Sequence, residues 1–109
     1  MTTFNPGLIV LLEFPNTDGA QGKPRPALVL LDSGDDDLLV ARVTSQSQQS
    51  SYEVPIVEWK AAGLRLPSTA RIHKLATMHK KKVRHIIGTL SEQDRKSVAA
   101  ALNSAFGNW

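Results

Sequence analysis

The sequence predicts a small, mainly β domain: a curled antiparallel sheet or partly open barrel of five or six short strands, followed by one amphipathic helix. Two observations support this fold class. Short apolar runs alternate with polar, turn-forming segments over most of the chain, and an apolar stripe with the period of a helix appears near its end. With 109 residues the chain can build one hydrophobic core but not two, so we expect a single domain, residues 1–109.

The first half of the chain contains four apolar runs that predict strands, with turn formers between them. These predicted strands are residues 8–14, 27–31, 38–44 and 52–58. The segment Asn16–Gly22 is polar and contains glycine, which predicts a mobile loop too long for a tight hairpin. Pro55 lies inside the fourth run. Because proline cannot donate to a strand ladder, this strand is predicted at a sheet edge or a bulge.

The second half predicts two more strands and the helix. Residues 68–74 and 83–87 read as strands, joined through a basic segment with a turn at residues 80–82. Ser91 is the predicted N-cap of the helix, and Asp94 three residues later approximates a capping box with the shorter acid. The apolar face of this helix is predicted to consist of Val98, Leu102, Ala105 and Phe106.

Composition excludes several classes of protein. The chain has no cysteine, which rules out disulfides and thiolate metal sites, and its three scattered histidines disfavour a structural zinc site. We therefore expect no metal and no cofactor. No apolar run is long enough to cross a bilayer, and the N-terminus MTTFNPG lacks the features of a signal peptide. A cytoplasmic protein without a membrane segment is expected.

The basic residues are concentrated in one segment of a chain whose formal net charge is +3. From Arg71 to Arg84 the sequence reads RIHKLATMHKKKVR and contains no acid, whereas acids gather at residues 35–37. This asymmetry indicates an anionic partner, most commonly nucleic acid. The alternative interpretation is a solvated turn whose lysines serve solubility.

The stretch KPRPALVL places Arg25 between two prolines, directly ahead of an apolar run. Proline fixes its own φ and holds the preceding residue in an extended conformation, so Lys23 and Arg25 are both constrained. An arginine at the start of a strand is otherwise expected to pair with a surface acid such as Asp18. The prolines raise the question of what Arg25 is held in place to bind.

Four motifs occur in order at compatible spacing: GLIVLLEFPNTDGAQGKPRPALVL, VARVTSQ, AGLRLPSTARIHKLATM and IIGTLSEQD. Through them, from Gly7 to Phe106, the chain resembles the MazF/PemK family of bacterial toxins, which are messenger RNA endonucleases paired with an antitoxin. The resemblance implies an SH3-like antiparallel barrel of five to seven strands with a C-terminal helix, assembled as a homodimer. It also implies metal-independent cleavage of single-stranded RNA, in which the ribose 2′-hydroxyl attacks the adjacent phosphorus.

Such a reaction needs a cation at the phosphorane, a base and an acid. The resemblance assigns the cation to Arg25, whose guanidinium fork matches phosphate oxygens, and a hydroxyl donor to Thr44. His73 stands where one branch of the family has an aspartate base, and its imidazole suits that role at neutral pH. Ala76 replaces a further basic residue. A base elsewhere, such as Glu13, or weakened activity are the alternatives.

Further residues are expected to hold the RNA or to support the site. Glu13 is predicted to orient Arg25 from the first strand, and the loop Asn16–Gly22 to flank the RNA groove. The family's antitoxins carry acidic, disordered tails, which would occupy the same basic groove. The predicted RNA-binding residues are Lys23, Ser45, Arg71, Lys80, Lys81 and Lys82.

Two other functions are consistent with the sequence. The same fold serves a gyrase poison that acts through its C-terminal helix and a terminal tryptophan, and this chain ends in FGNW. The second is a basic SH3-like module that binds RNA without cutting it. This alternative stays open because His73 and Ala76 differ from the residues that the family has at these positions.

Overall fold

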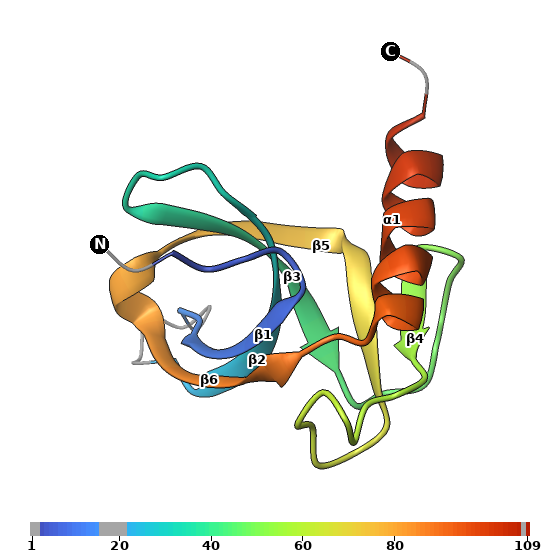
Figure 1. The fold of residues 1–109 in the computed structure, drawn as a ribbon, viewed down its shortest axis with the longest axis horizontal. Helices are drawn as coiled ribbons and strands as arrows, with labels where there is room; N and C mark the ends of the chain where they lie inside the picture. Colours follow the sequence, from blue (N-terminus) through green and yellow to red (C-terminus); the bar gives the residue numbers. More distant parts are fainter. Residues whose placement is uncertain (1–2, 16–21, 108) are drawn as a thin grey trace.

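A computed structural model describes residues 3–15, 22–107 and 109. It confirms a mainly β chain with a C-terminal helix (Figure 1). The elements are β1 (Leu8–Glu13), β2 (Pro24–Asp32), β3 (Asp37–Thr44), β4 (Glu53–Ile56), β5 (Ser68–His79), the 3₁₀ turn η1 (Lys80–Lys82), β6 (Val83–Thr89) and α1 (Glu92–Phe106). The predicted loop Asn16–Gly22 lies, except for Gly22, outside the described residues.

The strands form one antiparallel sheet in the order β4-β5-β3-β2-β1-β6, which curls strongly on itself (Figure 1). Among the described strands, β4 and β6 form the two edges, so the sheet is not closed into a barrel by hydrogen bonds. The predicted SH3-like barrel is therefore confirmed only as a curled sheet of six strands with a helix. Pro55 lies in edge strand β4, as predicted, where a missing N–H is tolerated.

Two strands extend at least three residues beyond their predicted bounds at one end. β5 continues past Lys74 to His79 because its second part pairs with β3, from Leu75 opposite Ala41 to His79 opposite Asp37. β2 begins at Pro24 rather than at Ala27. In both cases pairing with a neighbouring strand extends the element beyond its apolar run.

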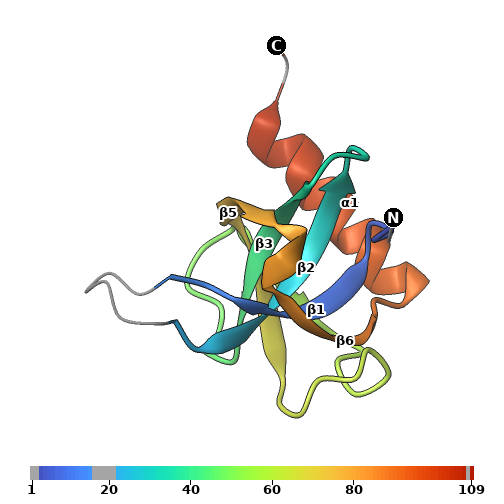
Figure 2. The ribbon, with the colours of Figure 1, turned by 90° about the vertical axis from the view of Figure 1, so that its left-hand side faces the viewer.

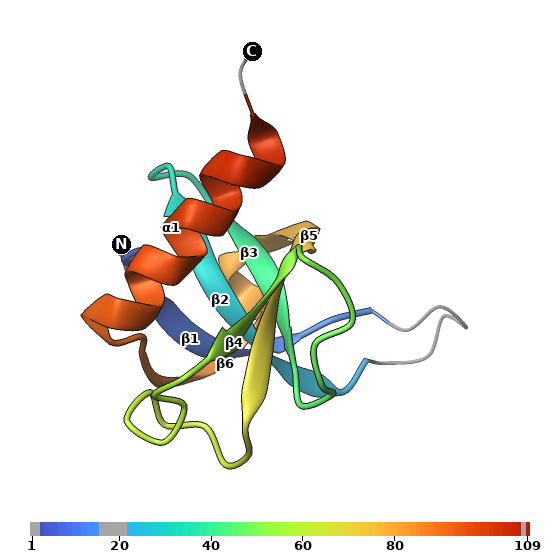
Figure 3. The same ribbon diagram turned by 90° about the vertical axis from the view of Figure 1, so that its right-hand side faces the viewer.

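Both faces of the sheet are buried. Successive strand residues alternate between two clusters, so Ile9 and Leu28 pack in one and Val10 and Ala27 in the other. The first cluster includes Val98 of α1, which lies across the β4 and β5 side of the sheet (Figure 3). The second cluster lies on the opposite face and is completed by Phe4, which precedes β1, and Phe14, which follows it.

A turn at residues 57–64 lies against the edge strand β6 (Figure 2). Two glycines allow this approach. A Cβ on Gly88 would lie 2.1 Å from the carbonyl oxygen of Ala62, and a Cβ on Gly63 would lie 2.5 Å from that of Ile87. Gly63 also has a φ of +91°, which side chains disfavour. The backbones of the turn and of β6 are thus in direct contact.

Asp94 connects this turn to the helix. Its side chain is fully buried. The carboxylate accepts the backbone N–H groups of Val57, at 3.0 Å, and Glu58, at 2.9 Å. Ser91 is the N-cap, as predicted, and its hydroxyl accepts the N–H of Asp94 at 3.2 Å. One carboxylate therefore fixes both the first turn of α1 and the start of the 57–64 turn.

Two further carboxylates are held by N–H groups and a cation. Asp32 accepts the N–H groups of Phe4 and Gly34, each at 2.9 Å, and forms an ion pair with Lys80 at 3.0 Å. These contacts, the N–H of Phe4 foremost, lower the pKa of Asp32 to about 2. The pKa of Glu53 is also lowered, chiefly by the N–H of Gln49 and then by Arg71, against the opposing effect of burial.

Replacing Asp94 should destabilise the fold. In Asp94→Ala two backbone N–H groups lose their acceptor, which is expected to lower the free energy of unfolding by about 3 kcal/mol in urea titrations. Glu92→Ala is the matched control, because it removes the same charge from an exposed position in the same helical turn. An equal decrease in the free energy of unfolding in the two variants would contradict the role given to Asp94.

Acid should weaken the fold through Asp32. Its pKa is about 2 in the folded state against an ordinary value of 3.8, so its contribution is complete above the ordinary value and is lost as the pH falls toward 2. Asp32→Asn is therefore expected to be less stable than wild type at pH 6, and the difference should shrink steadily below pH 4. Urea titrations over a pH series measure it. Asp36→Asn, an exposed neighbour, should show no such convergence.

Candidate functional site

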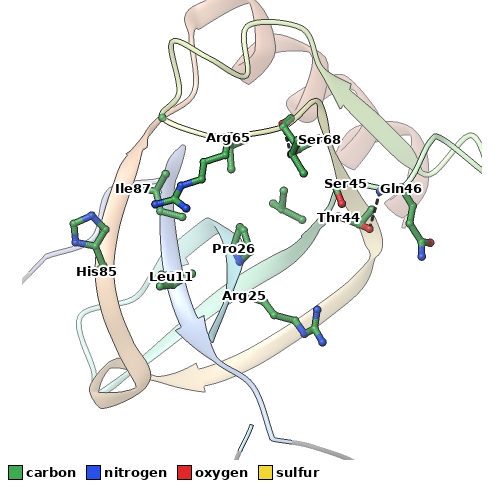
Figure 4. A pocket seen from close by; sticks show the side chains of 14 residues that line it. Leu11, Arg25, Pro26, Thr44, Ser45, Gln46, Arg65, Ser68, His85 and Ile87 are labelled. Atoms are coloured by element: carbon green, nitrogen blue, oxygen red, sulfur yellow. Dashed lines mark hydrogen bonds between the residues drawn. The ribbon is translucent and has the colours of Figure 1, made fainter. Parts of the chain in front are cut away.

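A groove of about 680 Å³ opens at one end of the curled sheet. Its lining comes from β1, β2, β3, β5 and β6 and from the segment that follows β4 (Figure 4). The polar and charged side chains in it are Arg25, Thr44, Ser45, Gln46, Arg65, Ser68 and His85.

The groove begins where pairing between β2 and β3 ends. The last paired residues are Ala27 and Arg42, while β2 itself extends back to Pro24 and β3 forward to Thr44. Continuing this register would place Arg25 opposite Thr44. Proline has no N–H to donate, so the residues on either side of Arg25 cannot extend the ladder. The two prolines thus leave the sheet open here, with Arg25 and Thr44 both lining the opening.

The hydroxyl of Thr44 is oriented by its own loop. Its oxygen accepts the N–H of Gln46 at 3.1 Å, which leaves the hydroxyl hydrogen to donate elsewhere. Arg25 is exposed and, among the described residues, forms no ion pair. Ser45, predicted to bind RNA, lines the groove beside Thr44. This end therefore combines an unpaired guanidinium with hydroxyl and amide donors, a set that suits a phosphate group.

The other end contains two residues that the sequence did not indicate, Arg65 and His85. Figure 4 shows the side chain of Arg65 directed toward Ile87 of β6, the strand that also carries His85, whereas the side chain of Arg25 extends in the opposite direction. Arg65 lies in an irregular segment and His85 in a run of basic residues. Neither periodicity nor the quoted motifs mark them out; only the approach of the 57–64 turn to β6 brings them together.

Several predicted site residues lie outside this groove. His73 is exposed on β5, with its ring centroid 5.9 Å from that of Tyr52. Arg71 donates to Glu53 at 2.9 Å. Arg84 binds Glu13, which was predicted to orient Arg25. The groove thus brings together Arg25, Thr44 and Ser45, but not these residues.

The predicted lysines also lie outside the groove lining. Lys80 forms the ion pair with Asp32, and Lys81 and Lys82 are exposed in η1, the turn predicted for them. Lys82 borders a separate hollow beside Glu13 and Gly22. Lys23 is exposed immediately before β2. These cations lie elsewhere on the surface and do not line the groove.

The described residues contain no cluster of three histidines, aspartates or glutamates that could hold a metal ion. No described helix is both long and apolar enough to cross a membrane.

Comparison with known proteins identifies similar chains. A family model described as "PemK-like, MazF-like toxin of type II toxin-antitoxin system" matches residues 5–106. The structure is similar to the Mycobacterium tuberculosis toxin MazF-mt6, with 24% identity and a TM-score of 0.77 over 96% of this chain and 100% of that one. It is also similar to MazF from Deinococcus radiodurans, with 22% identity and a TM-score of 0.75 over 99% and 100% of the two chains.

A third similar structure is an endoribonuclease in complex with its cognate antitoxin from a mycobacterial species. Its identity is 16% and its TM-score 0.73, over 98% of this chain and 99% of that one. At these identities the structural likeness is one of fold. No curated protein matches the sequence.

Proposed function

The chain belongs to the PemK-like, MazF-like toxins of type II toxin–antitoxin systems, and we propose that it is an endoribonuclease that cleaves single-stranded messenger RNA in the groove. The observation that carries this proposal is that Arg25 and Thr44 both line the groove where the β2–β3 ladder ends. Two similar structures are described as endoribonucleases, which supports the same activity here.

In the proposed reaction the ribose 2′-hydroxyl oxygen bonds to the adjacent phosphorus and the bond from phosphorus to the 5′ oxygen breaks. The products are a 2′,3′-cyclic phosphate and a 5′-hydroxyl. Since the nucleophile belongs to the RNA, the protein needs chiefly to stabilise the charge on the phosphorane. Arg25 supplies a permanent charge and a fork of donors, and Thr44 a hydroxyl donor. The proposal requires no metal.

Arg25 is well suited to this role because its backbone is constrained. The flanking prolines fix the chain on both sides, and Ala27 to Val29 are buried in the sheet, so only the side chain has to be ordered on binding. Neither residue predicted as the base lines the groove. His73 lies on the exposed part of β5 outside the groove, and Glu13 is bound by Arg84, so neither is placed beside Thr44.

We further propose that a cognate antitoxin neutralises the protein by placing an acidic, disordered tail in the groove. Similar structures include toxin–antitoxin complexes, among them MazE-MazF from Deinococcus radiodurans. The two arginines of the groove favour an anionic peptide as they favour RNA. A homodimer acting in the cytoplasm completes this proposal, by analogy with the family.

Trp109 is fully exposed at the end of the chain, which is the observation in favour of a gyrase poison. Deleting residues 107–109 separates the two functions. A gyrase poison should lose its activity, whereas an RNA-cleaving groove, which takes no residue from this segment, should keep it.

Arg25→Ala should lower the rate of RNA cleavage by roughly 100- to 1000-fold, because loss of one preorganised donor to a transition-state oxyanion has this effect. Thr44→Val should lower it less, since it removes a neutral donor and keeps the shape of the side chain. The measurement is the rate at which purified protein cuts a long single-stranded RNA in the presence of EDTA, with fragment ends assayed for cyclic phosphate.

Lys74→Ala is the control, because Lys74 is an exposed cation on β5 outside the groove lining. It should cleave at nearly the wild-type rate. Intact RNA that stays bound to the wild-type protein would instead favour a non-cleaving RNA-binding module. An unchanged rate in Arg25→Ala would overturn the assignment of the active groove.

A further inference from the structure

We propose that the Arg65–His85 end of the groove is a second phosphate subsite, which binds the RNA phosphate next to the scissile one. The inference rests on the proposed function. The groove has two polar ends, with Arg25 and Thr44 at one and Arg65 and His85 at the other (Figure 4). The floor between them is largely apolar and includes Leu11 and Pro26.

The sheet register places residues of the two ends on strands that flank β1. Leu11 of β1 pairs with His85 of β6 on one side and with Pro26 of β2 on the other. These three residues form a row across three adjacent strands, so the backbone of His85 lies roughly 10 Å from that of Pro26, two strand spacings away. Consecutive phosphates of a single strand are likewise separated by a whole nucleoside, and the apolar floor offers a surface for its base.

Arg65 is held at this end by the packing of the 57–64 turn. The preceding Leu64 is buried, and its N–H binds the carbonyl oxygen of Trp59 at 3.0 Å. Gly63 places the turn against the backbone of β6, from which His85 projects. The backbone that carries Arg65 is thus ordered before any ligand binds.

The guanidinium of Arg65 is also available. Arg71 and Arg84 are bound by buried carboxylates, whereas Arg65 forms no ion pair among the described residues. A guanidinium fork matches two phosphate oxygens, and an imidazole N–H adds one further donor. A single RNA strand uses all of these features together: two phosphates for the two cationic ends and an intervening base for the apolar floor.

A substrate series tests the subsite. The shortest RNA that wild-type protein cleaves is prepared with each non-scissile phosphate replaced in turn by a neutral methylphosphonate. One replacement next to the cut is expected to lower kcat/KM about tenfold, as for loss of one charge-assisted contact. Arg65→Ala should lower kcat/KM for the natural RNA by a similar factor, mainly through KM. In this variant the methylphosphonate next to the cut should lower kcat/KM little further.

Matched variants separate this contact from general attraction. Arg65→Lys keeps the charge without the fork and should lie between wild type and Arg65→Ala. Lys74→Ala removes the same charge outside the groove. In this variant each methylphosphonate should lower kcat/KM by the same factor as in wild type. Since Arg65 is exposed, Arg65→Ala should keep the wild-type Tm.

Two results would overturn the subsite. In one, Arg65→Ala and the methylphosphonate lower kcat/KM by independent factors at every position of the RNA, so that no replacement costs less in the variant than in wild type. In the other, Arg65→Ala cuts RNA like wild type but is inhibited less by an acidic antitoxin peptide, which would make this end a peptide site. Failure of the proposed function gives a different result: the wild-type protein would leave every RNA intact, or Arg25→Ala would cleave the natural RNA at the wild-type rate.

Discussion

The buried carboxylate of Asp94 is the interaction on which the geometry of the groove depends. It binds the N–H groups of Val57 and Glu58 while its own residue lies in the capped first turn of α1. The turn that starts there ends with Arg65 at the groove and rests on β6 through paired glycines. A single buried acid, fully satisfied by hydrogen bonds, therefore couples helix, turn and sheet edge.

The wall of the groove formed by β2 and β3 depends on backbone hydrogen bonds that are missing between these two strands. Sheets extend wherever backbone N–H groups meet carbonyl groups, and the prolines beside Arg25 prevent this between β2 and β3. The unpaired strand ends become a wall with a constrained arginine and an oriented threonine. The site of Arg25 and Thr44 thus arises where regular pairing between β2 and β3 stops, which is where side chains can face a ligand instead of a neighbouring strand.

The sequence predicts what depends on local pattern. The strands, the edge position of Pro55 and the N-cap Ser91 follow from periodicity and from the chemistry of single residues. Strand register depends on residues far apart in the sequence, so local pattern could not predict that Arg25 and Thr44 share a site. Only the family resemblance predicted it. His73 lies outside the groove because pairing with β3 and β4 sets the face of each β5 residue. Arg65 was missed because it follows an irregular turn whose place is set by β6.

The order of the chain has a consequence for its synthesis. Arg25 and Thr44 leave the ribosome early, whereas β6, which pairs with β1 from Leu8 opposite Thr89, and Asp94 emerge much later. Domains acquire such long-range pairing only when both partners are available. A nascent chain therefore carries half of the groove without the other half. If the groove cuts RNA as proposed, it becomes active only after synthesis has passed β6 and Asp94.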